Sequence, residues 1–290
     1  MSSDGVIDHL SIWVHQTNKD NQPPYAVPIA QLGGLPKIIP DVPILAVFLS
    51  YYSIASLLCL LSIYQAVRSH QPCTLSLLMY LFSGERVVAC AMRIAWAYRI
   101  ANVRIAVASQ ILLQAGVILL YLMNVIIAGR VLRTLFGHRS WLRSILAALS
   151  IMTISSLVMV ITAIIVSVFT LEERSRDACL DVQRAAATYF VLLTTAPMMM
   201  LAACLKHKYN QVDGRLRSIL ALTAMSALLC MIMAGFKAGV IWETPRPIFS
   251  PAWYHSNICL YALGFGPEVL DLTMLFMARV DVRCNSLSNC

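Results

Sequence analysis

Residues 145–169 read ILAALSIMTISSLVMVITAIIVSVF, and this stretch decides the fold. It contains no charged side chain, and as a helix rising about 1.5 Å per residue it is long enough to cross a hydrocarbon core of about 30 Å. Six further runs of comparable length and hydrophobicity lie on either side of it. The sequence therefore predicts seven membrane-spanning helices, at residues 44–67, 74–98, 103–129, 145–169, 184–205, 218–241 and 256–278.

The composition of the whole chain agrees with this interpretation. Of 290 residues, 59% are hydrophobic and 12% are charged, and the mean hydropathy is +0.73, well outside the range of soluble proteins. The runs lack the short alternating pattern of a membrane β-barrel, so we expect an all-α, polytopic bundle. The net charge of +8 comes from Lys and Arg scattered in short loops. Without a basic stripe, nucleic acid is not an expected partner, whereas membrane lipids are.

Three parts of the chain are expected. They are an irregular Pro- and Gly-rich N-terminal segment (1–42), the seven-helix bundle (43–279) and a short tail (280–290). The first segment lacks a basic start and an apolar core, so we expect no cleavable signal peptide. Lys and Arg are most frequent in the loops after the first, third and fifth helices and at the C-terminus. The positive-inside tendency then places the N-terminus outside and the C-terminus in the cytosol, in the endoplasmic reticulum or the plasma membrane.

Charged residues occur inside the second predicted helix, in GERVVACAMRIAW (84–96). Glu85, Arg86 and Arg93 fall on one face of a helix, and Arg86 lies about 18 Å along it, near the bilayer midplane. A lone charge at that depth costs several kcal/mol, so this face should point into the bundle. Glu268 lies at a similar depth in the last helix. We therefore expect an interior polar cluster in which Arg86 pairs with a carboxylate.

The intramembrane polar residues are the candidate site. The candidate catalytic residues are Glu268, Asp271, Glu85 and Arg86, and the candidate substrate-binding residues are Gln114, Gln110, Arg93, Lys237, Trp253, Tyr254 and His255. A carboxyl group in apolar surroundings resists ionisation and can donate a proton, whereas an arginine partner holds another carboxyl group ionised. Lys237 is expected nearer the outer surface, where a lysine can extend its amine to water. No cysteine or histidine spacing predicts a metal site, and no cofactor is expected.

The last helix contains ALGFGPEVLD (262–271), in which two glycines and a proline precede Glu268. Pro267 lacks an amide donor and its ring clashes with the preceding turn. A helix broken here, beside an acid, would line a binding site with free carbonyl groups. A simple proline kink is the alternative.

Several segments together resemble a known family. PILAVFLSYYSIA, ERVVACAMRIAW, NVRIAVASQILLQAGV, FTLEE, DVQRAAATYF, AGFKAG and SPAWYHSNICLYALGFGPEVL are similar to fungal seven-helix integral membrane proteins without established function, often labelled family-C-like G-protein-coupled-receptor proteins. The resemblance covers roughly residues 33–283 and implies a fungal source and the seven-helix fold. It carries no catalytic residues. The family's last helix usually has one Glu, and here GFGPEVLD adds a break and Asp271.

Several functional classes remain open. An intramembrane polar cavity suits binding of a small apolar molecule, by a membrane cyclase, an isomerase or an accessory protein of fungal terpenoid or polyketide biosynthesis. A small-molecule receptor has the helix count in its favour, but the sequence lacks DRY-like and NPxxY-like motifs. A transporter would suit a broken helix beside acids, but no internal repeat is visible. A retinal protein needs a lysine in the last helix, which has none.

Overall fold

The computed structural model describes residues 23–25, 29–70, 73–136, 140–208, 214–248 and 250–277. Its long helices are α2 (Asp41–Arg68), α3 (Thr74–Tyr98), α4 (Val103–Phe136), α5 (Ser140–Phe169), α6 (Glu173–Lys208) and α7 (Gly214–Trp242), and the last span joins α8 (Asn257–Leu260), the π-helical turn η3 (Tyr261–Phe265) and α9 (Gly266–Met277). Within these ranges, 7 helices are long and apolar enough to cross a membrane. The predicted all-α, seven-helix architecture is confirmed, and its orientation in a membrane stays a prediction.

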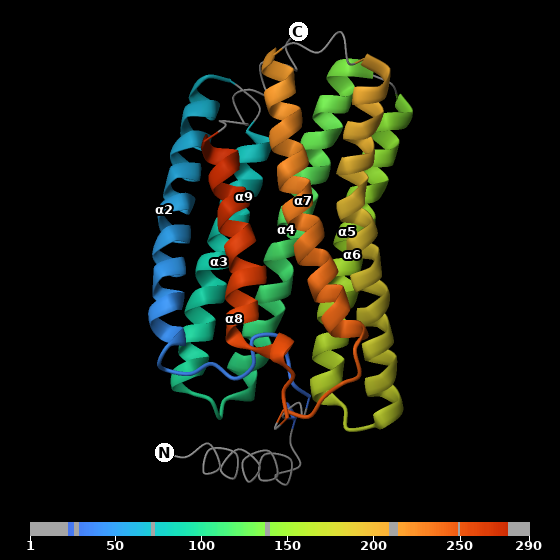
Figure 1. The fold of residues 1–290 in the computed structure, drawn as a ribbon. Helices are drawn as coiled ribbons and strands as arrows, with labels where there is room; N and C mark the ends of the chain where they lie inside the picture. The colour runs from blue at the N-terminus through green and yellow to red at the C-terminus, as the bar shows by residue number, and fades with distance from the viewer. Residues whose placement is uncertain are drawn as a thin grey trace.

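The helices run alternately up and down in one elongated bundle (Figure 1). α2, α3 and α9 form one side of it, and α5 and α6 form the other. α4 is the central helix and packs against α3, α5, α6 and α7. Of its most apolar stretch, 67% is buried, compared with 22% for α2 and α5, which lie at the periphery.

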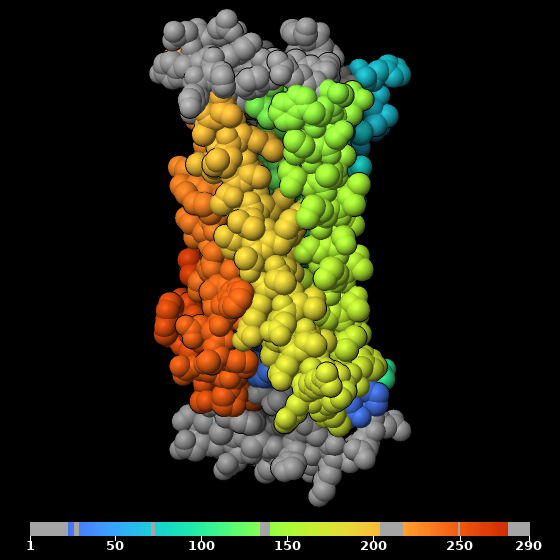
Figure 2. Space-filling view, turned by 90° about the vertical axis from the view of Figure 1, so that its right-hand side faces the viewer, coloured from blue at the N-terminus to red at the C-terminus, as the bar shows by residue number. Residues whose placement is uncertain are grey.

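The outer surface of the bundle is apolar. Large side chains such as Val47, Ile151 and Leu192 are more than half exposed and point away from the core. In Figure 2, α6 runs between α5 and α7 over the length of one face. A helix hydrogen-bonds its own backbone and needs no water, so such a surface is suited to lipid.

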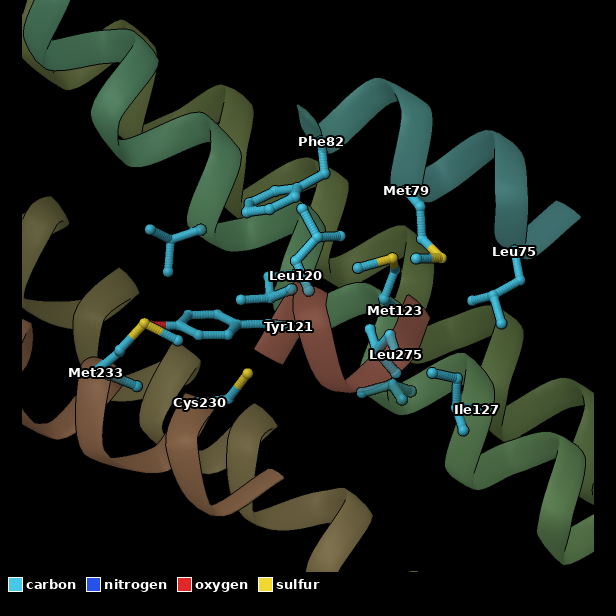
Figure 3. Close-up of a cluster of buried hydrophobic side chains, with 14 of the residues drawn as sticks. Leu75, Met79, Phe82, Leu120, Tyr121, Met123, Ile127, Cys230, Met233 and Leu275 are labelled. Carbon is cyan, nitrogen blue, oxygen red and sulfur yellow. The ribbon is translucent and has the colours of Figure 1, made fainter. Parts of the chain in front are cut away.

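The interior divides along the bundle axis into two halves. The apolar half contains the start of α3 and the end of α9, where Leu75, Met79, Met123, Ile127 and Leu275 form a close-packed cluster (Figure 3). The polar half lies toward the other end, where α2 begins, α3 ends and the last span starts. Its buried charged residues are Asp41, Arg86, Arg93, Glu268 and Asp271.

Several helices are longer than the apolar runs predict. α6 begins at Glu173 instead of residue 184, and α4 continues to Phe136 instead of residue 129. The added segment of α6, 173–183, is polar but contains neither Gly nor Pro, so nothing in it ends a helix. Hydropathy marks the membrane-embedded part of a helix and not the helix itself.

The predicted break in the last helix is wrong. The chain passes from α8 through the π-helical turn η3 into α9 without leaving a helical path, and the amide of Gly266 donates to the carbonyl of Tyr261. Pro267 cannot donate to the carbonyl four residues earlier, and its ring needs room there. The wider π turn supplies that room while the helix continues. Turns of this kind are frequent at functional sites.

Candidate functional site

A buried ion pair joins α3 to α9 in the polar half. Nη2 of Arg86 donates a hydrogen bond to Oε1 of Glu268 at 2.7 Å, and Nε lies 2.7 Å from Oε2. Arg86 is 0% exposed and Glu268 is 2% exposed. The hydroxyl of Tyr52, from α2, donates to Oε2 of Glu268 at 3.2 Å. Three helices thus converge on one carboxylate, which fixes its position.

Packing around Arg86 is close on every side. Its guanidinium carbon lies 5.5 Å from the ring centroid of Phe82 and 5.7 Å from that of Phe265. On the α4 side, a Cβ added to Gly116 would collide with the Glu85 carboxylate and would come within 2.7 Å of the Arg86 guanidinium carbon. Glycine at position 116 therefore allows α4 to approach the two charges.

Glu85 is the second acid beside the same cation. Its Oε2 lies 3.6 Å from Nη1 of Arg86, and its side chain is 13% exposed. Neither of its carboxylate oxygens makes a hydrogen bond within the described part of the chain. Arg86 therefore has two acidic neighbours, of which Glu268 is the more closely paired.

Lys237 of α7 points into the bundle. Its Nζ donates to the carbonyl of Leu113 at 3.4 Å and to Oε1 of Gln114 at 3.2 Å, both on α4. Among the described residues, no carboxylate oxygen lies within 4.0 Å of it. The expectation that this amine extends to the outer surface is therefore wrong, because two acceptors on α4 are within reach of a four-carbon side chain.

Lys237 and Gln114 lie between two internal spaces. The first, the polar cavity, has a volume of about 20 Å³ and is also lined by Gln110 and Glu268. The second, the apolar chamber, has about 40 Å³ and is lined mainly by aliphatic and aromatic side chains of α4, α5, α6 and α7. Such volumes hold a few water molecules at most, whereas small-molecule sites are commonly about 300–1,000 Å³. The described conformation is closed to larger molecules.

Asp271 lies one turn beyond Glu268, in a separate network. It is 0% exposed, and its Oδ2 lies 4.0 Å from Sγ of Cys230. Next to it, Ser226 donates to Oδ1 of Asn124 at 2.6 Å, and Asn124 donates to the Cys230 sulfur at 3.0 Å. Asp271 lines neither the polar cavity nor the apolar chamber. The structure thus separates two acids that the sequence places on one helix face.

Polar contacts also close the end of the polar half. Arg93 donates to the carbonyl of Gly33, so the segment 29–40 before α2 reaches the bundle interior. Asp41, 0% exposed, accepts from Asn257 at 2.6 Å and from Tyr261 at 3.1 Å. These bonds attach the start of α2 to the last span, and Leu32, in the segment before α2, lines the polar cavity.

Gly33 is required at this closure for two reasons. Its φ of +82° is in the left-handed region, and an added Cβ would come within 2.7 Å of Arg93. Nearby, the amide of Ala30 donates to the carbonyl of Arg246 at 2.8 Å. Residues 29–40 carry no helix, as expected for the N-terminal segment, and most of the rest of 1–42 lies outside the described residues. The proposed tail, 280–290, also lies outside them.

Three expected binding residues lie apart from the cluster. Trp253, Tyr254 and His255 form the 3₁₀ turn η2 (Trp253–His255) before α8, and none of them lines either space. Trp253 is 75% exposed, whereas His255 is buried. Burial lowers the pKa of His255, and the charge of Arg246 lowers it further. The remaining candidates lie in the polar half.

Four residues of these networks are not among the candidates expected from the sequence. Tyr52 and Gly116 contact the ion pair, Asp41 holds the last span, and Asn124 lies beside Asp271. Asp41 precedes the first apolar run, so the sequence places it in the irregular segment. Tyr52 carries a signal that could have been used, since a tyrosine in the middle of a span needs a hydrogen-bond partner.

No family model, no curated protein and no solved structure matches this chain. The resemblance to fungal seven-helix proteins therefore stays a prediction.

Proposed function

We propose that this chain is an integral membrane protein that binds a small, largely apolar molecule between its helices and catalyses a non-redox acid–base step on it. The proposed context is a cyclase or isomerase of fungal secondary metabolism, acting on a terpenoid or polyketide. One observation carries the proposal. An ion-paired carboxylate and a lysine line the same small cavity, and the lysine also borders an apolar chamber.

Each part of the site has a distinct task in this proposal. Lys237 and Gln114 hold the polar end of the molecule, and the apolar chamber holds the rest. Glu268 lines the polar cavity and takes a proton from the bound molecule or stabilises positive charge on it. As the ion-pair partner of Arg86, Glu268 fits these roles better than that of a proton donor. Arg86 and Tyr52 position the carboxylate.

Water exclusion follows from the same architecture. The polar cavity has room for one or two water molecules, and residues 29–40 cover its open end. Electrostatic interactions are stronger in such a site than in water. Substrate entry requires the site to open, because the described conformation is closed.

The test compares the metabolites made by a producing strain that carries substituted copies of this gene. Glu268→Gln should lower the product by about 10²–10⁴-fold, the range associated with general acid–base catalysis. Glu243→Gln, at an exposed position, is the matched control and should leave the product unchanged. The abundance of each variant in the membrane is measured in parallel, because loss of a buried charge also affects folding.

Two further variants separate chemistry from folding. Gln110→Leu and Lys237→Met alter the lining of the polar cavity without touching the Arg86–Glu268 pair. Both should reduce product at normal abundance. Normal product from all three cavity variants at normal abundance would remove the enzyme proposal. A transcriptional response to an added metabolite that is present in the wild type and absent in these variants would instead indicate a small-molecule receptor.

A further inference from the structure

The ammonium group of Lys237 lacks an anionic partner in the described part of the chain. Both of its hydrogen-bond partners, the Leu113 carbonyl and the Gln114 side chain, are uncharged. Two acids interact electrostatically with Lys237, and both lie beside a different cation, since Glu268 and Glu85 are 2.7 Å and 3.6 Å from Arg86. A partly buried cation without an anion is unfavourable in a medium of low polarity. The site therefore favours an anion from outside the chain.

The apolar chamber indicates what this anion is attached to. Its walls include Val117 and Tyr121 of α4, Val160 of α5 and Phe190 of α6. Along α4 the lining runs from residue 114 to residue 121, which is about 10 Å at about 1.5 Å per residue. Gln183, Ala187 and Phe190 of α6 also line the chamber, and α6 is the helix in the middle of the face shown in Figure 2. The lining is thus mostly apolar, and its polar members are Lys237, Gln114 and Gln183.

We propose that Lys237 and Gln114 bind the anionic head group, a carboxylate or a phosphate, of an amphipathic molecule whose apolar part occupies the chamber. Lys237 supplies the charge, and the amide nitrogen of Gln114 supplies a further donor. The assignment rests on the proposed function, whose substrate it defines as an apolar acid or an alkyl phosphate of about ten carbon atoms. No covalent step is involved in this binding.

Binding requires a local opening of the chamber. Its volume of about 40 Å³ is too small for a ten-carbon chain, and the opening that we propose separates the side chains of Tyr121 and Phe190, which both line it. Their ring centroids are 6.2 Å apart, and no hydrogen bond joins the two side chains. The Tyr121 hydroxyl has no hydrogen-bond partner among the described residues, so the ring can turn without losing a bond.

The experiment measures direct binding to the full-length protein in nanodiscs by equilibrium dialysis, with empty nanodiscs as the blank. The probes are decanoic acid, decyl phosphate and decanol, which share one chain and differ in the head group. At neutral pH, at least one of the anionic probes should bind saturably and about tenfold or more tighter than decanol. The preferred anion distinguishes a carboxylate from a phosphate head.

Substitutions test separately the residue that binds the head group and the wall that contacts the apolar chain. Lys237→Gln should abolish the preference for the anionic probes, whereas Lys37→Gln, at an exposed lysine, should retain it. Ala187→Phe adds a ring at a buried position in the chamber wall and should weaken binding of all three probes. Thermal unfolding of each variant confirms that it is folded before its binding is interpreted. If Ala187→Phe is unfolded, Ala187→Leu replaces it.

Three results would overturn the assignment. They are the absence of saturable binding above empty nanodiscs, equal affinity for decanol and both anions, and an anion preference that survives Lys237→Gln. The outcome is independent of product formation. If the anion preference is confirmed while Glu268→Gln makes normal product, the binding site stands and the catalytic proposal fails. If Glu268→Gln abolishes product while decanol binds as well as the anions, the reverse holds.

Discussion

The two halves of the bundle interior are built on opposite principles. In the apolar half, side chains such as Met79, Met123 and Leu275 fill space without a polar contact (Figure 3). In the polar half, the same helices bury Arg86 and Glu268 in a paired arrangement that depends on a glycine and a tyrosine. An apolar cluster tolerates replacement by side chains of similar volume, whereas a buried charge needs its specific partner. The polar half therefore depends on particular residues and not only on the volume of its side chains.

The largest expected effect comes from breaking the ion pair. Arg86→Leu leaves Glu268 buried without its cation, which should lower the free energy of unfolding by about 3–5 kcal/mol. Arg68→Leu, at the exposed end of α2, is the control and should leave the melting temperature nearly unchanged. The measurement is thermal unfolding in one detergent. Equal melting temperatures for the two variants would mean that Arg86 is not buried as described.

A smaller effect is expected from the tyrosine that supports the carboxylate. Tyr52→Phe removes a hydrogen bond to a charged acceptor, worth about 1.5–3 kcal/mol. Tyr121→Phe removes a buried hydroxyl that has no hydrogen-bond partner among the described residues, so its unfolding should change little. Chemical unfolding of both variants tests this difference. A larger loss for Tyr121→Phe would contradict the assignment of Tyr52 to the site.

Glycine positions give a third comparison. Gly116→Ala places a methyl group against Glu85 and the Arg86 guanidinium, and such overpacking costs about 1–3 kcal/mol. Gly235→Ala, on α7, has no atom within 4 Å of its added Cβ and should be neutral or stabilising, because alanine favours a helix. Melting temperatures in the reverse order would show that α4 does not approach α3 at this level.

The smallest expected effect depends on pH and concerns His255, at the end of the polar half. Burial and Arg246 lower the pKa of His255 in the folded protein below its ordinary value of about 6.5. Below pH of about 6.5 the unfolded chain therefore binds more protons than the folded one. As the pH is lowered further, the free energy of unfolding decreases until the pH is below the pKa of His255 in the folded protein. Melting temperatures measured on either side of pH 6 should show this loss in the wild type. If the His255→Gln variant shows the same decrease in melting temperature, the decrease comes from other groups.

The seven helices could be predicted because span length and hydropathy follow from the thickness of a bilayer. The depth of Arg86 and Glu268 could also be estimated from helix rise, and the structure brings them together. Whether Lys237 turns inward depends on acceptors of α4 that are distant in sequence, so its depth in the span predicted the wrong direction. Before Pro267 a helix can either break or widen, and here it widens into a π turn. Which of the two occurs depends on packing against neighbouring helices.

The separation of Asp271 from Glu268 could not be predicted for a related reason. Residues at i and i+3 share a helix face, but different neighbours meet that face at successive depths. Glu268 meets Arg86 of α3, whereas Asp271 meets Cys230 of α7. A depth and a face therefore restrict the candidates for a site without deciding which of them act together.

Arg86 and Glu268 act as one buried unit that ties α3 to α9. A double-mutant cycle of Arg86→Met and Glu268→Gln, followed by thermal and chemical unfolding in detergent, tests it most directly. Each single substitution should lower the free energy of unfolding by about 3–5 kcal/mol, and the double variant should lose no more than either single one. Losses that simply add in the double variant would show that the two residues do not interact.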